Sequence, residues 1–255
     1  MRRFNNQNKV SPIYLLPNVF TLGAMFCGFF AIVMSIKGNF IDCGIAIFFA
    51  MILDSLDGRV ARLTHTSSPF GAQLDSLSDM VAFGVAPAII AFNWHLHTLG
   101  KIGWLFAFIY CACASLRLAR FNTMIGMVDK RFFVGLPSPS AGALVVGYIY
   151  LCTKFNIHWK LVPIIGIGVI LLAAFSMVSN IRFYSFKEFN FYHKAKFRAL
   201  LIFLVGLALL IAYPDLFIYG FFVIYTITSY VMYIFRIGYN KKPIQDKRTV
   251  PAAKT

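Results

Sequence analysis

Four aspartates, Asp54, Asp57, Asp75 and Asp79, lie in a stretch of sequence that otherwise has the composition of membrane-spanning segments. The chain has only nine acidic residues, so nearly half of them fall between positions 54 and 79. An ionised carboxylate in lipid costs at least a few kcal/mol, and four together need a compensating cation or a water-filled site. This cluster is therefore where the sequence points to chemistry.

The spacing of the aspartates places them on two helix faces. Asp54 and Asp57 are three residues apart, and Gly71, Asp75 and Asp79 follow one another at intervals of four. The polar residues 63–70 between the two pairs predict a turn, so the two acidic faces can meet. A divalent cation would relieve the repulsion between four close carboxylates, and oxygen ligands suit Mg²⁺, Mn²⁺ or Ca²⁺.

Written as spacing, the segment is D-x2-D-G-x2-A-R-x8-G-x3-D-x3-D. This pattern resembles, without a mismatch, the signature of the CDP-alcohol phosphotransferases. The resemblance implies an integral membrane enzyme that transfers a substituted phosphoryl group from a CDP-linked donor to an alcohol and releases CMP. It further implies a direct attack of the alcohol on phosphorus, and a homodimer.

The same resemblance implies roles for individual residues. Asp54, Asp57 and Asp75 would bind metal, and Asp79 would complete the metal site and act as general base. The metal would be Mg²⁺ or Mn²⁺, with two ions per site. The CDP site would be lined by Gly58, Ala61, Arg62 and Gly71.

The residue types are compatible with these roles. Arg62 suits a diphosphate, because a guanidinium fork matches phosphate oxygens. The small residues Gly58, Ala61 and Gly71 allow a nucleotide to approach closely, and close helix packing explains them equally well. Asp54 lies roughly 12 Å along the helix from Arg62, which places the acids just below the cytoplasmic headgroups.

The aspartate pattern does not identify the acceptor alcohol, but other segments of the sequence indicate it. Residues 17–28, 116–122, 135–141 and 177–185 resemble the bacterial phosphatidylserine synthases within the same family. That resemblance implies CDP-diacylglycerol as donor and L-serine as acceptor. The candidate acceptor residues are Arg117, Arg120, Asn122, Ser138 and Ser140.

These acceptor candidates also have simpler explanations. Serine carries a carboxylate, which a cation such as Arg117 or Arg120 would hold, but a bias of positive charge toward the cytoplasm explains both arginines as well. Ser138 or Ser140 can equally cap the start of a helix.

The composition indicates a polytopic membrane protein of all-α class. Hydrophobic residues make up 59% of the chain and charged residues 13%, against about 25% charged in soluble domains. Apolar stretches near the ~20 residues needed to span a bilayer recur along the chain. They predict a bundle of about eight transmembrane helices and no strands, at residues 14–36, 39–62, 71–95, 102–121, 139–154, 161–181, 197–213 and 216–236.

The placement of positive charge predicts the topology. The net charge of +15 could indicate nucleic acid, but most lysines and arginines fall in the segments on one side of the predicted helices, and only Lys37, Lys101, Lys154 and Lys160 fall on the other. The positive-inside rule then places both termini in the cytoplasm, with the chain in the bacterial inner membrane and no nucleic-acid partner. The cations at headgroup depth would bind anionic membrane lipids.

The domain organisation follows from the same pattern. Residues 1–236 are expected to form a single catalytic transmembrane domain, with core helices at about 14–185 and two additional helices at about 197–236. Residues 237–255 form a basic tail that we expect to be disordered. The five cysteines lie in apolar spans without metal-ligand spacing and are expected to be free thiols.

The sequence leaves three alternatives open. The same chemistry could use another acceptor, such as choline or glycerol 3-phosphate. A cation-coupled transporter also places carboxylates in the membrane, but here the acids lie near one face and no inverted repeat is visible. A structural lipid-binding protein with a degenerate site is disfavoured because every residue of the pattern is intact.

Overall fold

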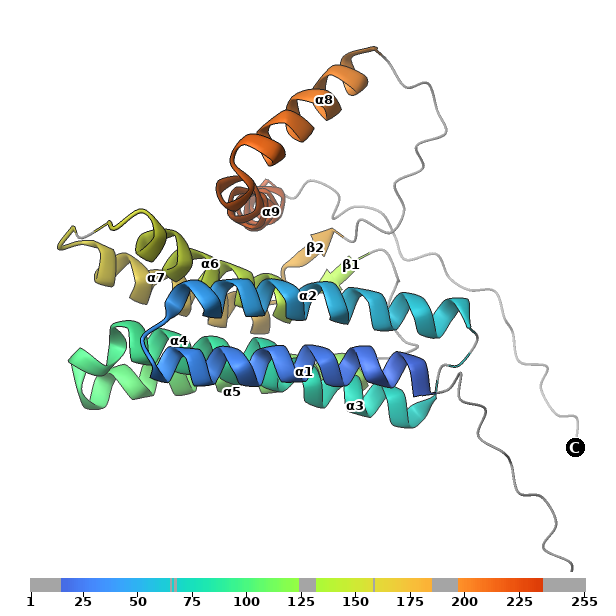
Figure 1. The fold of residues 1–255 in the computed structure, drawn as a ribbon, viewed down its shortest axis with the longest axis horizontal. Coiled ribbons are helices and arrows are strands. Elements are labelled where there is room, and N and C mark those ends of the chain that lie inside the picture. Colours follow the sequence, from blue (N-terminus) through green and yellow to red (C-terminus); the bar gives the residue numbers. More distant parts are fainter. Residues whose placement is uncertain are drawn as a thin grey trace, which may run out of the picture.

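The structure, a computed structural model, describes residues 15–64, 66, 68–123, 132–157, 159–184 and 197–235. These residues form long helices and two short strands (Figure 1). In chain order the elements are α1 (Leu15–Ile36), α2 (Phe40–Leu63), α3 (Pro69–Asp79), the π-helix η2 (Met80–Val85), α4 (Ala86–Trp94), the 3₁₀-helix η3 (Leu96–Leu99), α5 (Lys101–Thr123), β1 (Phe132–Val134), α6 (Ser138–Lys154), α7 (Val162–Val178), β2 (Arg182–Tyr184), α8 (Phe197–Ala212) and α9 (Pro214–Ile234).

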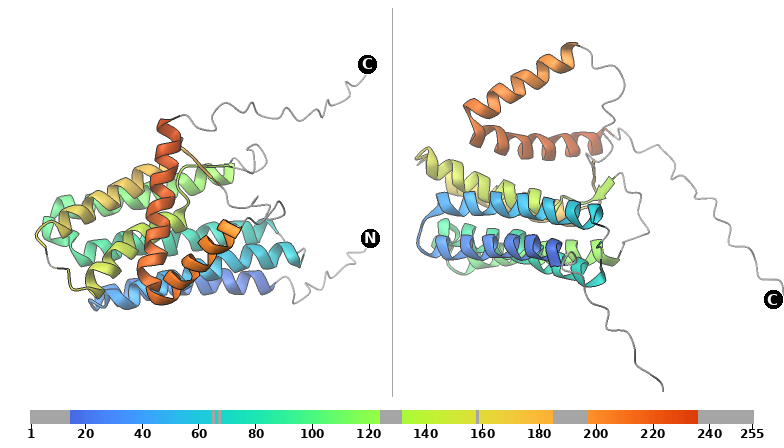
Figure 2. Two further views of the ribbon diagram at one scale, coloured as in Figure 1. Left: turned by 90° about the horizontal axis from the view of Figure 1, so that it is seen from above. Right: turned by 45° about the vertical axis from the view of Figure 1, so that its right-hand side comes forward.

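The helices are stacked in layers (Figures 1 and 2). One layer holds α1 and α3 to α5, and α2, α6 and α7 lie over it. Helix α9 lies beyond α6, and α8 packs against α9. The arrangement brings α1 against both α2 and α3, the two helices that carry the aspartates.

Small side chains allow the helices of the core to approach one another. Ala31, Ala50, Ala82 and Ala173 are completely or almost completely buried. At Gly28 of α1, a Cβ atom would lie only 2.6 Å from Cα of Ala82, so this crossing requires glycine. Close approach through small residues is how helices pack in a membrane, where lipid offers no hydrophobic driving force between them.

The helix expected at residues 71–95 begins at Pro69 and is not uniform. Ser68 caps its start by accepting the N–H of Gly71 at 3.0 Å. The chain then follows α3, a π-helical segment and α4 without leaving the helical path. The predicted helix is confirmed as a continuous helical span, Pro69–Trp94, but the π-helical turn inside it was not predicted. Pro87 supplies the physical reason for that turn, because a proline inside a helix removes a backbone hydrogen bond.

The expectation that the chain has no strands was wrong in one place. Strands β1 and β2 pair antiparallel, with Phe132 opposite Tyr184. The ribbon is followed by Gly135, whose φ of +84° and whose close approach to the carbonyl of Met177 exclude a side chain. This turn places the start of α6 beside the end of α7, because the N–H of Leu136 donates to the carbonyl of Ser176 at 3.0 Å. Three-residue strands carry too little pattern to be recognised in an apolar sequence.

Among the described residues, four helical segments are long and apolar enough to cross a membrane: Leu16–Ile36, Pro69–Trp94, Lys101–Thr123 and Pro214–Ile234. Eight spans are therefore not confirmed. Helices α6, α7 and α8 have 17, 17 and 16 residues, which is short of the ~20 needed for a full span. Helix α2 is long enough, but it carries the acidic pair and two arginines near its end.

The structure confirms that all five cysteines, Cys27, Cys43, Cys111, Cys113 and Cys152, are free. The predicted tail, 237–255, lies outside the described residues.

Candidate active site

Three carboxylates meet where α2 and α3 face each other. Asp54 and Asp57 of α2 and Asp75 of α3 each contribute an oxygen, and these oxygens all lie within 4.8 Å of one another. Asp57 is buried, with 5% of its surface exposed, while Asp54 and Asp75 are partly exposed. The two helical faces expected from the spacing therefore do meet across the turn between the helices.

Helix α1 holds the two acid-bearing helices together. The hydroxyl of Thr21, itself buried, donates to Oδ2 of Asp57 at 2.7 Å. The backbone carbonyl of the same Thr21 accepts the hydroxyl of Ser78 on α3 at 2.8 Å. One residue of α1 thus contacts both α2 and α3 and fixes how their acidic faces are set.

Asp79 lies beside this group of three. Its carboxyl interacts electrostatically with those of Asp54 and Asp75 and with the guanidinium of Arg117. Its Oδ2 also accepts the hydroxyl of Ser138 at 3.4 Å. The four aspartates are therefore contiguous, with three in a tight group and Asp79 at its edge.

Arg117 is a buried cation that faces Asp79 and Asp54. Only 9% of the residue is exposed, and its Nη1 donates to the hydroxyl of Ser138 at 2.7 Å. The guanidinium also interacts electrostatically with Asp79 and Asp54. A buried charge needs such partners, because burial without them is costly. A chain of contacts therefore runs from Arg117 through Ser138 to Asp79.

The other proposed acceptor residues have different surroundings. Arg120 donates to the carbonyls of Val178 and Ser179 and to Oδ1 of Asn180, which ties α5 to the end of α7. Asn122 and Ser76 of α3 are hydrogen-bonded at 3.0 Å.

Ser138 and Ser140 are both buried in the first turn of α6, and no side-chain hydrogen bond caps this helix at its N-terminus. The hydroxyl of Ser138 is directed to Asp79 instead, so the capping interpretation does not hold for this residue.

The residues expected to line a nucleotide site gather at the adjoining ends of α2 and α3. Gly58, Ala61 and Arg62 lie in the last turns of α2, and Gly71 lies in the first turn of α3. A Cβ atom at Gly71 would lie 3.5 Å from Oδ1 of Asn18, so α1 also borders this surface. The Arg62 side chain is exposed there and lies outside the core.

This arrangement has a defined chemical capacity. Carboxylate oxygens from two helices converge at distances that a hard divalent cation can bridge, so the residues present fit such an ion. Asp79 stands at the edge of the cluster, with a hydroxyl and a guanidinium next to it. Acids, an exposed arginine and a glycine-lined surface together suit a phosphorylated nucleotide.

Comparison with known proteins agrees with this geometry. A chain named CDP-diacylglycerol–serine O-phosphatidyltransferase from Helicobacter pylori strain J99 is 35% identical over 236 residues, covering 91% of this chain and 98% of that protein. A protein of the same name from Bacillus subtilis strain 168 is 38% identical, covering 68% of this chain and 92% of its own length. One from Methanocaldococcus jannaschii is 45% identical over 49% of this chain and 58% of its own length.

The match to a family extends over most of the helical bundle. The sequence model of the CDP-alcohol phosphatidyltransferase family matches residues 14–178. This range begins just before α1 and ends with α7. All four aspartates, Arg117 and Ser138 fall inside that range. The chain belongs to the CDP-alcohol phosphatidyltransferase family.

Proposed function

We propose that the protein transfers the phosphatidyl group of CDP-diacylglycerol to the hydroxyl of L-serine, giving phosphatidylserine and CMP. The observation that carries the proposal is the cluster of Asp54, Asp57 and Asp75 with Asp79 at its edge, in a chain whose relatives bear the name of this activity. A transferase passes the phosphatidyl group to an alcohol, whereas a hydrolase would pass it to water. CMP release from CDP-diacylglycerol by the purified protein, dependent on added serine, tests the proposal.

The four aspartates would hold Mg²⁺ or Mn²⁺, and we assign two ions to the site. The bound metal would neutralise the diphosphate and stabilise the phosphate of the leaving CMP. Asp57 is fixed for this task by Thr21, and Asp75 is fixed by the placement of α3 on α1.

Asp79 would act as the general base. It would take the proton from the serine hydroxyl as that oxygen forms a bond to the phosphatidyl phosphorus and the bond from phosphorus to the CMP oxygen breaks. The Ser138 hydroxyl orients the Asp79 carboxylate. The reaction needs no covalent enzyme intermediate, because the cluster offers a base but no paired nucleophile. Inversion of configuration at a chiral phosphorus in the donor would support this, and net retention would contradict it.

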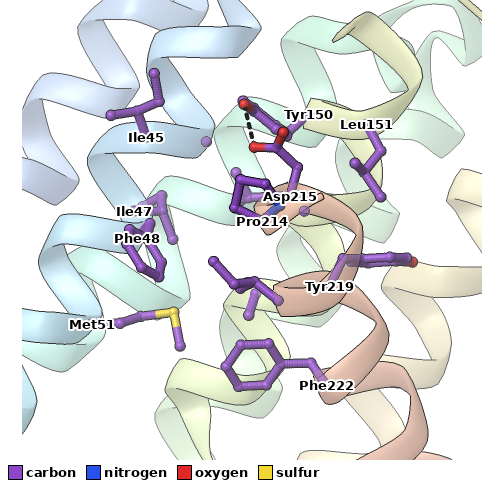
Figure 3. Close-up of a pocket in the computed structure, with 15 residues that line it drawn as sticks. Ile45, Ile47, Phe48, Met51, Tyr150, Leu151, Pro214, Asp215, Tyr219 and Phe222 are labelled. Atoms are coloured by element: carbon purple, nitrogen blue, oxygen red, sulfur yellow. Dashed lines mark hydrogen bonds between the residues drawn. The ribbon is translucent and has the colours of Figure 1, made fainter. Parts of the chain in front are cut away.

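The donor would lie with its nucleotide against Gly58, Ala61, Arg62 and Gly71 and its chains in the membrane. A cavity of about 240 Å³, lined mainly by apolar side chains, lies between α2, α6 and α9 (Figure 3). Met51 and Phe222 line its wall, and Met51 is one helical turn from Asp54. A second apolar cavity, of about 590 Å³, lies between α6, α7 and α9. Both are suitable for acyl chains.

The acceptor would bind between Asp79 and Arg117. A serine molecule whose carboxylate pairs with Arg117 would have its hydroxyl within reach of Asp79, since Ser138 contacts both residues. Arg120, Asn122 and Ser140 would complete this part of the site from the end of α5 and the start of α6. A panel of choline, glycerol 3-phosphate and serine distinguishes the alternatives.

The topology and assembly are part of the same proposal. Residues 1–236 would form one catalytic domain with eight membrane spans in the bacterial inner membrane and both termini in the cytoplasm, bordered by anionic lipids. The protein would be a homodimer. Reporter fusions at positions 8 and 245 should both indicate the cytoplasm, and the mass of the purified protein in detergent should equal that of two chains.

A further inference from the structure

The π-helical segment η2 begins at the residue that follows Asp79. In the middle of it, the helix lacks one ordinary hydrogen bond: the carbonyl of Phe83 would be bonded in an α-helix to the N–H of residue 87, which is a proline. The chain responds by widening, and the N–H of Ala86 donates to the carbonyl of Val81, five residues back. Pro87 is therefore the local cause of the π-helix.

The carbonyl of Phe83, which has no N–H to accept at Pro87, is hydrogen-bonded from another helix. The hydroxyl of Tyr110 on α5 donates to the carbonyl oxygen of Phe83 at 3.0 Å. Both residues have no exposed surface. A buried carbonyl without a partner is costly, and water has no access here, so Tyr110 supplies the donor that proline removed.

The segment is also enclosed by its neighbours. Gly28 of α1 meets Ala82 so closely that no side chain fits between them. On the other side, a Cβ atom at Gly84 would lie 3.2 Å from Cβ of Ala114 on α5. Helices α1 and α5 thus pack closely against the widened turn from two sides.

The widened turn sets the relative rotation of the two halves of the helix. One extra residue in a helical turn changes the phase of all following residues by about 100°. On the near side, Ser78 bonds to the carbonyl of Thr21 and holds the acidic face of α3 against α1. On the far side, α4 buries Ala86, Ala88 and Ile90 in the core. A regular α-helix could not satisfy both contacts at once.

We propose that Pro87 and Tyr110 are positioning residues for Asp79 and Asp75: Pro87 forces the π-helical turn, and the Tyr110 hydroxyl stabilises it. The Tyr110 hydroxyl bonds to the carbonyl of Phe83 and not to an aspartate. The inference rests on the proposed role of Asp79 as base. Through it, α4 and α5 affect the reaction by setting the backbone conformation of the helix that carries the aspartates.

Two substitutions and a control test the proposal. Pro87→Ala restores an N–H and lets the helix become regular, so it should rotate the aspartates away from their partners. The melting temperature should fall only slightly, because the hydrogen bond gained within the helix offsets the contact that is lost. We expect kcat to fall by about 10- to 100-fold, as a displacement of about 1 Å at a catalytic group does. Tyr110→Phe should lower both kcat and the melting temperature. Tyr148→Phe removes a similar bond, from a tyrosine hydroxyl to the carbonyl of Val162 at 2.8 Å, and should leave kcat within about twofold.

A measurement independent of turnover completes the test. Binding of Mn²⁺, followed by electron paramagnetic resonance, should weaken in Pro87→Ala because Asp75 and Asp79 move together. The double variant Pro87→Ala/Tyr110→Phe should show a smaller loss of melting temperature from the tyrosine change than the single variant. The reason is that the backbone N–H restored at position 87 can then donate to the carbonyl of Phe83 in place of the lost hydroxyl.

The proposal is overturned if Pro87→Ala keeps full kcat and Mn²⁺ affinity, or if the two losses of activity only follow the losses of melting temperature. Asp79→Asn separates this result from the proposed reaction. An inactive Asp79→Asn together with a fully active Pro87→Ala would keep the role of the base and reject the positioning role. An active Asp79→Asn would reject the base itself.

Discussion

The hydroxyl of Thr21 donates to Oδ2 of Asp57 at 2.7 Å, across the boundary between α1 and α2. Asp57 is the least exposed of the three clustered acids, and α1 carries none of them. Helix α1 therefore takes part in the site by orienting an acid that another helix supplies.

Replacing Thr21 with valine should impair the site, because valine keeps the shape of threonine but removes the donor. Leaving the buried Asp57 oxygen without this bond costs about 1–3 kcal/mol. We expect kcat/KM to fall about tenfold and the concentration of Mg²⁺ needed for half-maximal rate to rise. Thr21→Ser keeps the hydroxyl and is the matched control. Equal rates for Thr21→Val and Thr21→Ser would show that the bond is dispensable.

Removal of divalent metal should abolish activity. Within the described part of the chain, no lysine or arginine forms an ion pair with the three clustered carboxylates, and a divalent ion is the counter-charge that their oxygens fit. Excess EDTA should stop CMP release, and Mg²⁺ or Mn²⁺ should restore it. Full activity after verified removal of metal would reject the metal-site assignment.

The aspartates should divide into two classes when each is changed to asparagine. Asp79→Asn should lower the rate by about 10²–10⁴ while CDP-diacylglycerol still binds, because the base is lost and the shape is kept. Asp54→Asn and Asp75→Asn should weaken Mn²⁺ binding and donor binding as well. Isothermal titration with the donor and with Mn²⁺, alongside rate measurements, distinguishes the classes. Identical phenotypes for all three variants would mean that Asp79 has no separate role.

The two arginines of α5 should also differ. Arg117→Lys keeps the charge but loses the fork that reaches Ser138, so we expect the KM for serine to rise at least about tenfold with little change in the KM for the lipid. Arg120→Ala should raise the KM for serine more than that for the lipid and should also lower the melting temperature, because Arg120 bonds to the end of α7. Steady-state kinetics with each substrate varied in turn measures both effects. A larger effect on the lipid than on serine in both variants would contradict the acceptor assignment.

The sequence was sufficient to predict which residues form the acidic cluster. The spacing places Asp54 and Asp57 on one helix face, and Asp75 and Asp79 on another. Because only a short turn joins the two helices, they must pack side by side. Contacts between helices far apart in the chain could not be predicted in the same way. The bonds from Thr21 to Asp57 and from Ser138 to Asp79 join residues 36 and 59 positions apart, and helical periodicity does not indicate which helix packs on which.

The break after Asp79 was predictable in principle but was missed. Pro87 is a recognised signal of helix disruption, and it lies inside the helix predicted at residues 71–95. The sequence could not show how the break would be accommodated, because the donor to Phe83 comes from Tyr110 on another helix. The short ribbon of β1 and β2 was missed because it contains only three residues in each strand.

Serine is the proposed acceptor of the phosphatidyl group. Purified protein in detergent with Mg²⁺ and CDP-diacylglycerol should be given serine, choline or glycerol 3-phosphate in separate reactions, with CMP and the lipid product both measured. We predict phosphatidylserine and CMP in equal amounts with serine, and no lipid product with the other two. Turnover of another alcohol with serine inert would contradict the account of the acceptor site.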